Sequence, residues 1–305
     1  MNLGRYFTQK GIKLSGFYGR NSSSVKKASE ITNSTLYTSY EKIIKDSDIL
    51  FITTPDDIIS TIDRELSKFD LKNKSVCHAS GSLKSTVLSN AKLSGALIYS
   101  IHPMFAFSNK EVPLNKMENM FFSIEGELNA QNIDDIPIIN LINSLGNKYF
   151  IRDINDSATY HLANVFVSNL VLSLINIGTS YLEKLGLTEH DAIHALFPLI
   201  QGNIENIYEN GFEKSLTGPA VRGDIDTIKK HLQVLNDEDK DVYTSLSLNL
   251  LKLVGNSRFD DSISEFDKKD NIDFEHLYIK ENALKNLLNT SMKHKEIFKI
   301  LGGTE

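Results

Sequence analysis

The sequence predicts an α/β domain with a doubly wound parallel sheet, followed by a second domain that is all α. The chain has 305 residues, which is enough for two domains. In its first half, short apolar runs that predict strands alternate with helical segments, as in β-α-β units. From about residue 153 the periodicity is helical. We therefore expect an α/β domain over residues 1–152 and a helical domain over residues 153–305.

The elements of the first half are set by apolar runs and by the polar residues that end them. The run 48–53 is apolar almost throughout, which is typical of a strand buried on both faces of a parallel sheet. The expected strands cover 12–18, 48–53, 75–79, 96–101, 120–125 and 148–152. The expected helices cover 1–10, 24–30, 39–45, 58–67 and 133–145.

A long apolar helix is expected over residues 153–186, between the two domains. Asn155 or Asp156 can cap its start, and Gly186 can end it in a left-handed conformation. Its first half carries a polar stripe at helical spacing, whereas the continuation of that stripe is apolar. We expect a helix this apolar to be mostly buried, so its polar groups need partners, and a ligand can be one. The stripe consists of Ser157, Tyr160, His161, Asn164 and Ser168.

The rest of the second half is predicted to be helical. A helix over 188–210 contains Pro198, which should kink or split it. A loop over 216–223 and two helices, 224–235 and 240–254, follow. The polar stretch 256–272 is interpreted as a surface linker, and the last helix is expected over 275–301.

Composition narrows the possible partners and compartments. The net charge is −6 and the basic residues are dispersed, which argues against nucleic acid as a partner. The single cysteine, Cys77, lies in an apolar run and is interpreted as a core residue. The start of the chain does not resemble a signal peptide and no run of 18 apolar residues occurs, so we expect a cytoplasmic protein without a membrane partner. The eight histidines lack metal-site spacing, so no metal is expected.

Two loops at expected strand ends are candidates for cofactor binding, because ligands of a doubly wound sheet lie there. Arg20 and Ser22 follow the first expected strand, and a guanidinium beside hydroxyls suits a ribose 2′-phosphate. A surface arginine in a polar turn fits this loop equally well. Thr53, Thr54 and Pro55 follow the apolar strand 48–53, where they form either a lip over a cofactor or a helix start, or both.

Two further loops at strand ends carry Ser80 and His102. A histidine at such a position can act as an acid or base near neutral pH. For each histidine taken alone, a half-buried side chain bonded to the backbone is the favoured interpretation.

The run LTGPAVRGD over 216–224 resembles a family of uncharacterised bacterial proteins, as do Tyr160, His161, Asn164 and the earlier His102-Pro103 pair. That family pairs a Rossmann-like domain, similar to NADP-dependent oxidoreductases, with a helical domain of unknown function. The resemblance covers roughly residues 1–255. The wider superfamily it resembles includes pyrroline-5-carboxylate reductase, ketopantoate reductase and 6-phosphogluconate dehydrogenase.

The resemblance implies NADP as cofactor, with Arg20 and Ser22 at its phosphate and Thr53, Thr54 and Pro55 along it. We also predict that Ser80 contributes to cofactor binding. It also implies a homodimer formed through the helical domain.

In the dehydrogenases of that superfamily, the interdomain helix carries a lysine or a comparable donor and an asparagine. Here His161 and Asn164 occupy that region and no lysine matches. His161 is the candidate acid or base, Asn164 would orient a substrate and His102 would be a second donor. The remaining candidates around a small-molecule substrate in the cleft between the domains are Tyr160, Ser168, Thr217 and Arg222.

One departure from the resemblance concerns the start of the sheet. The family begins with a strand and a Gly-x-Gly-x-x-Gly loop, whereas residues 1–6 of this chain align with the helix that follows that loop. We therefore expect a gap at the centre of the strand order 3-2-1-4-5-6, with unpaired edges beside it. A mis-assigned start or clipped chain is the favoured explanation, ahead of a decaying gene copy or a fold that lost its cofactor.

Two functions remain open from the sequence. The first is an NADP-dependent oxidoreductase acting on a small carbonyl, imine or alcohol. The second is a non-catalytic dinucleotide or metabolite sensor, or a scaffold, whose cofactor binding is impaired because the glycine-rich loop is missing.

Overall fold

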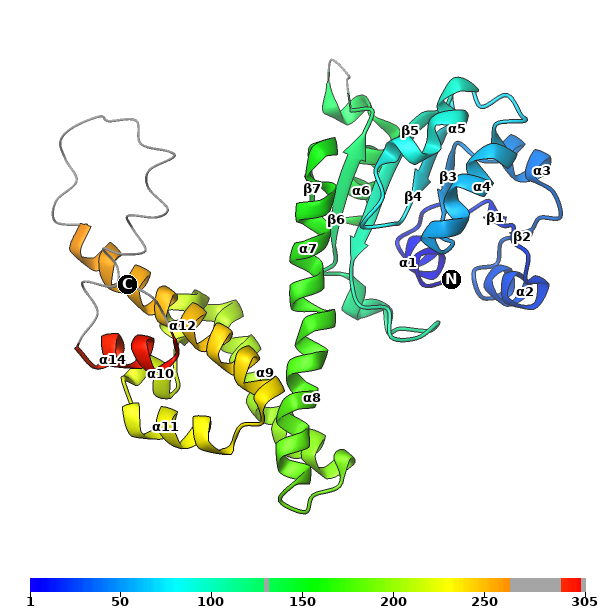
Figure 1. The fold of residues 1–305 in the computed structure, drawn as a ribbon. Helices are drawn as coiled ribbons and strands as arrows, with labels where there is room; N and C mark the ends of the chain where they lie inside the picture. Colours follow the sequence, from blue (N-terminus) through cyan, green and yellow to red (C-terminus); the bar gives the residue numbers. More distant parts are fainter. Residues whose placement is uncertain (129–131, 264–291, 303–305) are drawn as a thin grey trace. The chain divides into compact units, whose positions relative to one another are not determined.

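The computed structural model describes residues 1–128, 132–263 and 292–302. It divides into two compact units, Met1–Leu172 and Ser173–Glu305. The first unit is α/β and the second is helical (Figure 1). The predicted fold class is therefore confirmed.

The main sheet of the first unit has five strands in the order β3-β4-β5-β6-β7. The pairs β3–β4, β4–β5 and β6–β7 are parallel, and β5–β6 is antiparallel. The strands are β3 (Ile49–Ile52), β4 (Ser75–His78), β5 (Leu97–Met104), β6 (Phe121–Gly126) and β7 (Tyr149–Ile151). Strand β5 continues to Met104, beyond the expected end at 101, because its residues 102–104 still pair with β6.

The two remaining strands form a separate parallel sheet. These are β1 (Gly16–Phe17) and β2 (Thr35–Leu36), which pair with each other and with no strand of the main sheet. The break falls between β1 and β3, where the sequence predicts a gap. Ser75 N donates to Asp48 O, and Ala79 N donates to Ile52 O. The even-numbered residues along β3 therefore direct their backbone N–H and C=O groups toward β4. Since alternate residues of a parallel strand bond to opposite neighbours, Ile49 and Phe51 turn their backbone groups to the open edge.

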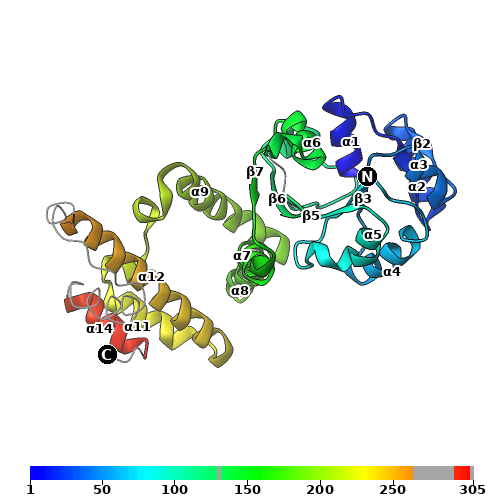
Figure 2. The same ribbon diagram turned by 90° about the horizontal axis from the view of Figure 1, so that it is seen from above.

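Helices cover both faces of the main sheet (Figure 2). On one face lie α1 (Asn2–Gln9) and α6 (Pro137–Leu145), and on the other lie α4 (Asp56–Leu66) and α5 (Ser89–Leu93). The short sheet is flanked by α2 (Ser22–Ile31) and α3 (Tyr40–Lys45). Four short 3-10 helices complete this unit up to α7: η1 (Ser85–Leu88), η2 (Leu114–Met117), η3 (Ile133–Asp135) and η4 (Ile154–Asp156).

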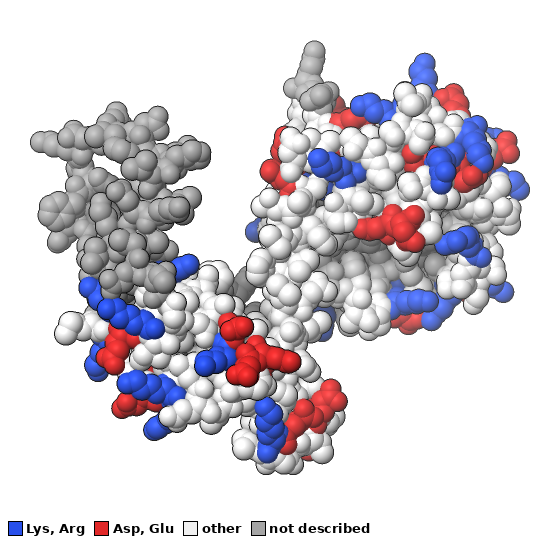
Figure 3. Space-filling view, in the orientation of Figure 1, with Lys and Arg blue, Asp and Glu red and all other residues white. Residues whose placement is uncertain are grey.

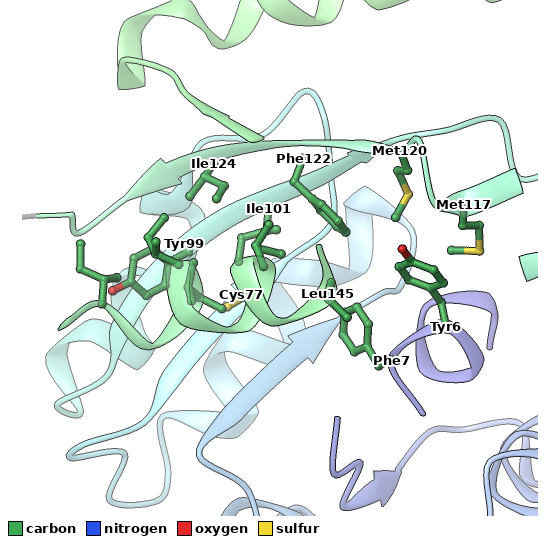
Figure 4. Close-up of a cluster of buried hydrophobic side chains, with 14 residues drawn as sticks. Tyr6, Phe7, Cys77, Tyr99, Ile101, Met117, Met120, Phe122, Ile124 and Leu145 are labelled. Carbon is green, nitrogen blue, oxygen red and sulfur yellow. The ribbon is translucent and has the colours of Figure 1, made fainter. Parts of the chain in front are cut away.

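The core on the α1–α6 face contains Cys77, which is fully buried as the sequence predicts. Burial raises the pKa of its thiol well above the usual value, so the group is inert at neutral pH. Figure 4 shows Tyr6 and Phe7 of α1 entering this core. The Tyr6 hydroxyl donates to Oδ1 of Asn147 at 2.7 Å. The side-chain amide nitrogen of Asn147 in turn donates to the backbone carbonyl oxygens of Met117, Glu118 and Met120, at the end of η2 and just after it. These bonds fix α1 against the sheet.

The expected long helix is present, but it is broken in the middle and largely exposed. It consists of α7 (Ser157–Val167) and α8 (Asn169–Glu183), which are separated at Ser168. By length and composition alone, Ile154–Glu183 could cross a membrane, and only 6% of its most apolar window is buried. The expectation of a mostly buried helix is therefore wrong for the single chain. Within the first unit, Leu162, Phe166 and Val167 are each more than half exposed.

In the second unit, α9 (Glu189–Ser215) contains Pro198 but breaks at Gly211, which has φ 76° and ψ 174°. The helix does not split at Pro198, because the residue with non-helical backbone angles is Gly211. The helices α10 (Pro219–Arg222), α11 (Ile225–Val234), α12 (Asp237–Ile263) and α14 (Met292–Ile300) follow. Thus α12 extends into the stretch 256–272 that we interpreted as a linker. The rest of that stretch, and residues 275–291 of the predicted last helix, lie outside the described residues.

Candidate functional site

The first unit contains a pocket of about 360 Å³ at the carboxyl edge of the main sheet. Its walls come from the amino end of α1, the residues after β3 and β4, and the end of β5. The loop that follows β5 closes another side with Phe105 and Phe107. Ligands of doubly wound sheets bind outside the carboxyl ends of the strands, so this pocket is the candidate site.

The amino end of α1 presents unsatisfied donors to this pocket. Met1 occupies the cap position and no side chain caps the free N–H groups of the first turn. Asn2 holds the neighbouring loop, since its amide nitrogen donates to Asn109 O at 2.6 Å and its Oδ1 accepts from Val112 N at 3.2 Å. A helix start with free N–H groups favours an anionic ligand group.

Thr53, Thr54, Ser80 and His102 all line the pocket, so four of the predicted site residues come together. Thr54 is unusual among them. Its Oγ1 is buried and has no hydrogen-bond partner among the described residues. A buried hydroxyl without a partner is costly, and a ligand in the pocket could supply that partner.

Ser80 is held by the carboxylate of Asp56. Oγ of Ser80 donates to Oδ2 of Asp56 at 2.8 Å, and Oγ of Ser82 donates to the same oxygen at 2.7 Å. Ser80 Oγ in turn accepts from Leu83 N at 3.1 Å. Ser82 N also donates to Ser80 Oγ at 3.2 Å, so the hydrogen and both lone pairs of this hydroxyl are engaged, and Ser80 shapes the pocket rather than offering a free donor.

The second feature of the site is a polar face on β5 and β6. Alternate residues of a strand point to opposite faces, and here Ser100 pairs with Glu125 while His102 pairs with Ser123 across the two strands. Three of these four side chains are buried and His102 is half-buried. This polar quartet lies opposite the apolar face that Tyr99, Ile101, Phe122 and Ile124 turn to the core.

Arg152 binds the polar quartet from the residue after β7. Its guanidinium donates to Ser123 Oγ through Nε at 3.0 Å, to Ser100 Oγ through Nη2 at 2.9 Å and to Ser157 Oγ through Nη1 at 2.5 Å. Its side chain is 2% exposed, and the Glu125 carboxylate lies 4.0 Å from Nη2. Glu125 is itself held by the backbone N–H and the hydroxyl of Ser85. A buried cation is thus matched by hydroxyls and one carboxylate, which keeps it rigid.

Tyr160 of α7 connects this network to the pocket. The guanidinium of Arg152 lies 5.1 Å from the centre of its ring, and its hydroxyl is 2.5 Å from Nδ1 of His102. Burial, with the nearby Arg152 and His161, lowers the pKa of His102 to about 4, and Asp56 opposes this shift. His102 is therefore neutral at physiological pH.

Several predicted residues lie away from the pocket. Arg20, Ser22 and Pro55 do not line it, and Arg20 and Ser22 are exposed at the carboxyl end of β1. In α7, His161 is exposed and Asn164 donates to the Tyr160 carbonyl at 2.8 Å, one turn earlier.

The other predicted site residues are occupied locally or belong to the second unit. Ser168 donates to the Asn164 carbonyl at 2.6 Å, at the break between α7 and α8. Thr217 precedes α10 and Arg222 ends it, so both belong to the second unit, within which they are exposed. Their roles stay predictions.

Sequence reasoning missed Arg152, Ser123, Glu125 and Asp56. The signal for two of them is present, because YSIH over 99–102 and FSIE over 122–125 alternate apolar and polar residues in consecutive strands. Such alternation is unexpected in strands buried on both faces and marks a polar interior face. The pairing of Arg152 with that face requires the register of β7, which no local pattern contains.

Comparisons with known proteins agree with this architecture. Residues 120–250 match the family model described as a domain of unknown function, DUF2520. No curated protein matches the chain. The resemblance found in the sequence is therefore confirmed.

Three solved structures share the fold. A protein from Thermotoga maritima is 24% identical with a TM-score of 0.64, and the match covers 85% of this chain and 97% of that one. A candidate NADP oxidoreductase from Bacteroides fragilis is 20% identical with a TM-score of 0.64, covering 82% and 92%. The pyrroline carboxylate reductase of Plasmodium falciparum, solved with NADP bound, is 16% identical with a TM-score of 0.50, covering 84% and 90%. At these identities the likeness establishes the Rossmann-like fold and its helical partner domain.

Proposed function

We propose that this chain is an NADP-dependent oxidoreductase whose cofactor binds in the pocket at the carboxyl edge of the main sheet. The observation that carries the proposal is the Thr54 hydroxyl: the residue lines this pocket, and its buried oxygen has no hydrogen-bond partner among the described residues. The substrate would be a small molecule with a carbonyl, imine or alcohol group, as the sequence predicts. Its specific identity is left open.

The residues present fit a dinucleotide in part. The uncapped start of α1 suits a phosphate, and Thr53 and Thr54 lie where the chain leaves β3. Arg20 and Ser22 would hold a 2′-phosphate at the end of β1, in the neighbouring short sheet. When bound, the cofactor supplies or accepts a hydride, and the protein residues position it and exclude water.

His102 is the better placed of the predicted acid–base residues in the first unit. It lines the pocket and is fixed by Tyr160, whereas His161 is exposed on α7. Its lowered pKa makes it a neutral hydrogen-bond donor or acceptor at neutral pH and a poor source of protons. His161 and Asn164 remain candidates for contacts with a substrate that approaches α7.

A non-catalytic binding role is the second candidate function. It is favoured by the lowered pKa of His102, which makes this histidine a poor source of protons. Binding of NADPH without turnover of any carbonyl, imine or alcohol substrate would support this role.

The first experiment is a fluorescence titration of the full chain with NADPH and with NADH. We expect binding with a preference for NADPH. A Thr54→Val variant removes only the hydroxyl, and loss of one ligand hydrogen bond of about 1 kcal/mol should weaken binding by about five-fold. Thr61→Val, on the exposed side of α4, is the matched control. Equal binding by Thr54→Val and wild type would remove the main support for this pocket.

We also propose that the chain forms a homodimer through its exposed apolar helices. No Asp, Glu, Lys or Arg occurs between Asp156 and Glu183, and α7 and α8 are uncoloured along most of their visible length in Figure 3. Asn164, Asn169 and Asn176 interrupt the apolar sequence. Amides are costly in lipid and are tolerated in a protein interface, so we favour a second copy over a membrane.

The dimer is tested by light scattering of the purified chain over a range of concentrations, with flotation on neutral phospholipid vesicles in parallel. A mass of twice the chain without flotation is expected. A monomer at every concentration, or flotation with the vesicles, would refute the dimer.

A further inference from the structure

The segment that joins β4 to η1, residues 79–84, forms part of the pocket wall, and we call it the β4 loop. Its first two residues, Ala79 and Ser80, line the pocket. Gly81 lies against the ring of His102, because a Cβ atom at Gly81 would be 3.1 Å from two atoms of that ring. The path of the β4 loop therefore sets the shape of one wall and the space beside a pocket histidine.

His78, the last residue of β4, binds this loop at both ends. Its side chain is fully buried. Nδ1 of His78 accepts from the backbone N–H of Ser80 at 3.2 Å, and Nε2 lies 3.1 Å from the carbonyl oxygen of Lys84. Because a backbone N–H only donates and a carbonyl oxygen only accepts, Nδ1 carries the lone pair and Nε2 carries the hydrogen.

We infer that His78 is a positioning residue, which holds the β4 loop at the pocket through these two hydrogen bonds. The inference rests on the proposed function only for the identity of the ligand that the pocket binds. The other tautomer of His78 would set Nδ1–H against the Ser80 N–H and would leave the Lys84 carbonyl without this donor. A doubly protonated ring would meet the Ser80 N–H with the same conflict, so only one form of the ring makes both bonds.

The groups around His78 favour this neutral form. Burial lowers the pKa of His78, and the nearby Arg152 also lowers it. The hydrogen bond to Lys84 and the carboxylates of Glu125 and Asp56 oppose this shift. These three charged groups come from three different parts of the first unit, namely the residue after β7, strand β6 and the start of α4. With its pKa below the usual value, His78 is neutral at physiological pH, as the two bonds require.

The other polar groups of Ser80 are also engaged. Its carbonyl oxygen accepts from Ser100 Oγ at 3.3 Å, and its hydroxyl is held by Asp56. Since His78 takes up the N–H, Ser80 has no donor left for a ligand. The β4 loop thus contributes shape to the pocket, whereas the hydroxyl of Thr54 still needs a partner.

The tautomer of His78 is tested by a long-range proton–nitrogen NMR correlation of the full chain near neutral pH, without cofactor. The protein is labelled uniformly with nitrogen-15 and carbon-13, and the ring is assigned by through-bond connection to its own backbone. We expect a pyrrole-type Nε2 and a pyridine-type Nδ1. A pyrrole-type Nδ1 would overturn the inference, and this result does not depend on any variant.

The positioning role is tested by amide hydrogen exchange at Ser80 in variants of His78. An asparagine places an acceptor oxygen near the position of Nδ1, and a glutamine places an N–H donor near that of Nε2. We expect His78→Asn to exchange at the wild-type rate. In His78→Gln the Ser80 amide should exchange about five-fold faster, as the loss of one hydrogen bond predicts.

Val76→Ala is the matched control, because Val76 is also fully buried on β4, on the same face as His78, but has an apolar side chain. It should leave exchange at Ser80 unchanged. If His78→Asn exchanges as fast as His78→Gln, an acceptor at Nδ1 does not hold the loop and the inference is wrong.

The same variants connect the loop to ligand binding. We expect NADPH to bind more weakly to His78→Gln than to His78→Asn, in the order of the exchange rates. Since the tautomer and the exchange rates are measured without cofactor, failure of the wild type to bind NADPH would count only against the proposed function.

Discussion

Replacing His102 with glutamine should make the stability of the first unit less dependent on pH. His102 is half-buried, and burial together with Arg152 and His161 lowers its pKa to about 4 in the folded protein. In the unfolded chain a histidine has a pKa of about 6.5. Between these values the unfolded state binds a proton that the folded state does not, so stability falls as the pH falls.

The magnitude follows from the difference between the two pKa values. Each pKa unit corresponds to about 1.4 kcal/mol, and lowering the pH from about 7.5 to about 5 should cost the wild type about 2 kcal/mol through His102 alone. The full loss, about 3 kcal/mol, is reached only below pH 4 or so, once the folded form is also protonated. Above about pH 6.5 the contribution of His102 no longer changes.

The assay is urea denaturation of wild type and His102→Gln at both pH values, monitored by circular dichroism. His78 also has a pKa lowered by burial, but it is present in both proteins and cancels in the comparison. The wild type should lose about 2 kcal/mol more than the variant on acidification. Equal losses in the two proteins would refute the assignment of a neutral, desolvated His102.

Three further predictions concern packing and assembly. Gly81→Ala places a Cβ about 3.1 Å from Nε2 of His102, so we expect shifted His102 ring resonances in NMR spectra, and unchanged resonances would contradict this contact. Asn147→Ala removes four hydrogen bonds that hold α1 and the end of η2. Urea denaturation should show that the free energy of unfolding falls by about 2–4 kcal/mol, whereas a fall below about 0.5 kcal/mol would mean that other contacts hold α1. Leu172→Glu, on the exposed apolar helix, should shift the mass from light scattering from dimer to monomer. Leu93→Glu, at a still more exposed leucine on α5, should leave the mass unchanged, and the same mass for both variants would argue against an interface on this helix.

The sequence predicted most of the α/β unit because its signals are local. Apolar runs ended by polar residues located the main strands, and the predicted gap in the strand order appears as the break between β1 and β3. Ser39 accepts from a first-turn N–H group of α3, where the sequence predicts a helix start, whereas α2 is capped by Asn21 and begins two residues before the expected start at 24. Such features depend on a few consecutive residues, so they can be predicted without knowledge of tertiary contacts.

The parts that the sequence did not predict depend on long-range contacts. Arg152 reaches Ser100 across 52 positions, and this pairing follows only from the register of β6 and β7. The polar stripe of α7 was predicted as a single face, yet Ser157 and Tyr160 are buried while His161 is exposed. Helical spacing gives the angle between side chains but not which of them the sheet covers.

The burial of the long helix was also beyond local reasoning. Its apolar sequence indicates that the helix is covered, but a sequence does not say whether the cover comes from the same chain or from another. In the single chain, Leu172 is 67% exposed, which is the basis for proposing a second copy.

The central claim is that the pocket at the carboxyl edge of the main sheet binds NADP, and a crystal structure of the full chain grown with NADPH tests it most directly. We predict density for the cofactor between the start of α1 and the ends of β3 to β5, with one of its polar atoms within hydrogen-bond distance of Thr54 Oγ1. Density elsewhere in the protein, or an empty pocket at a saturating NADPH concentration, would contradict the claim.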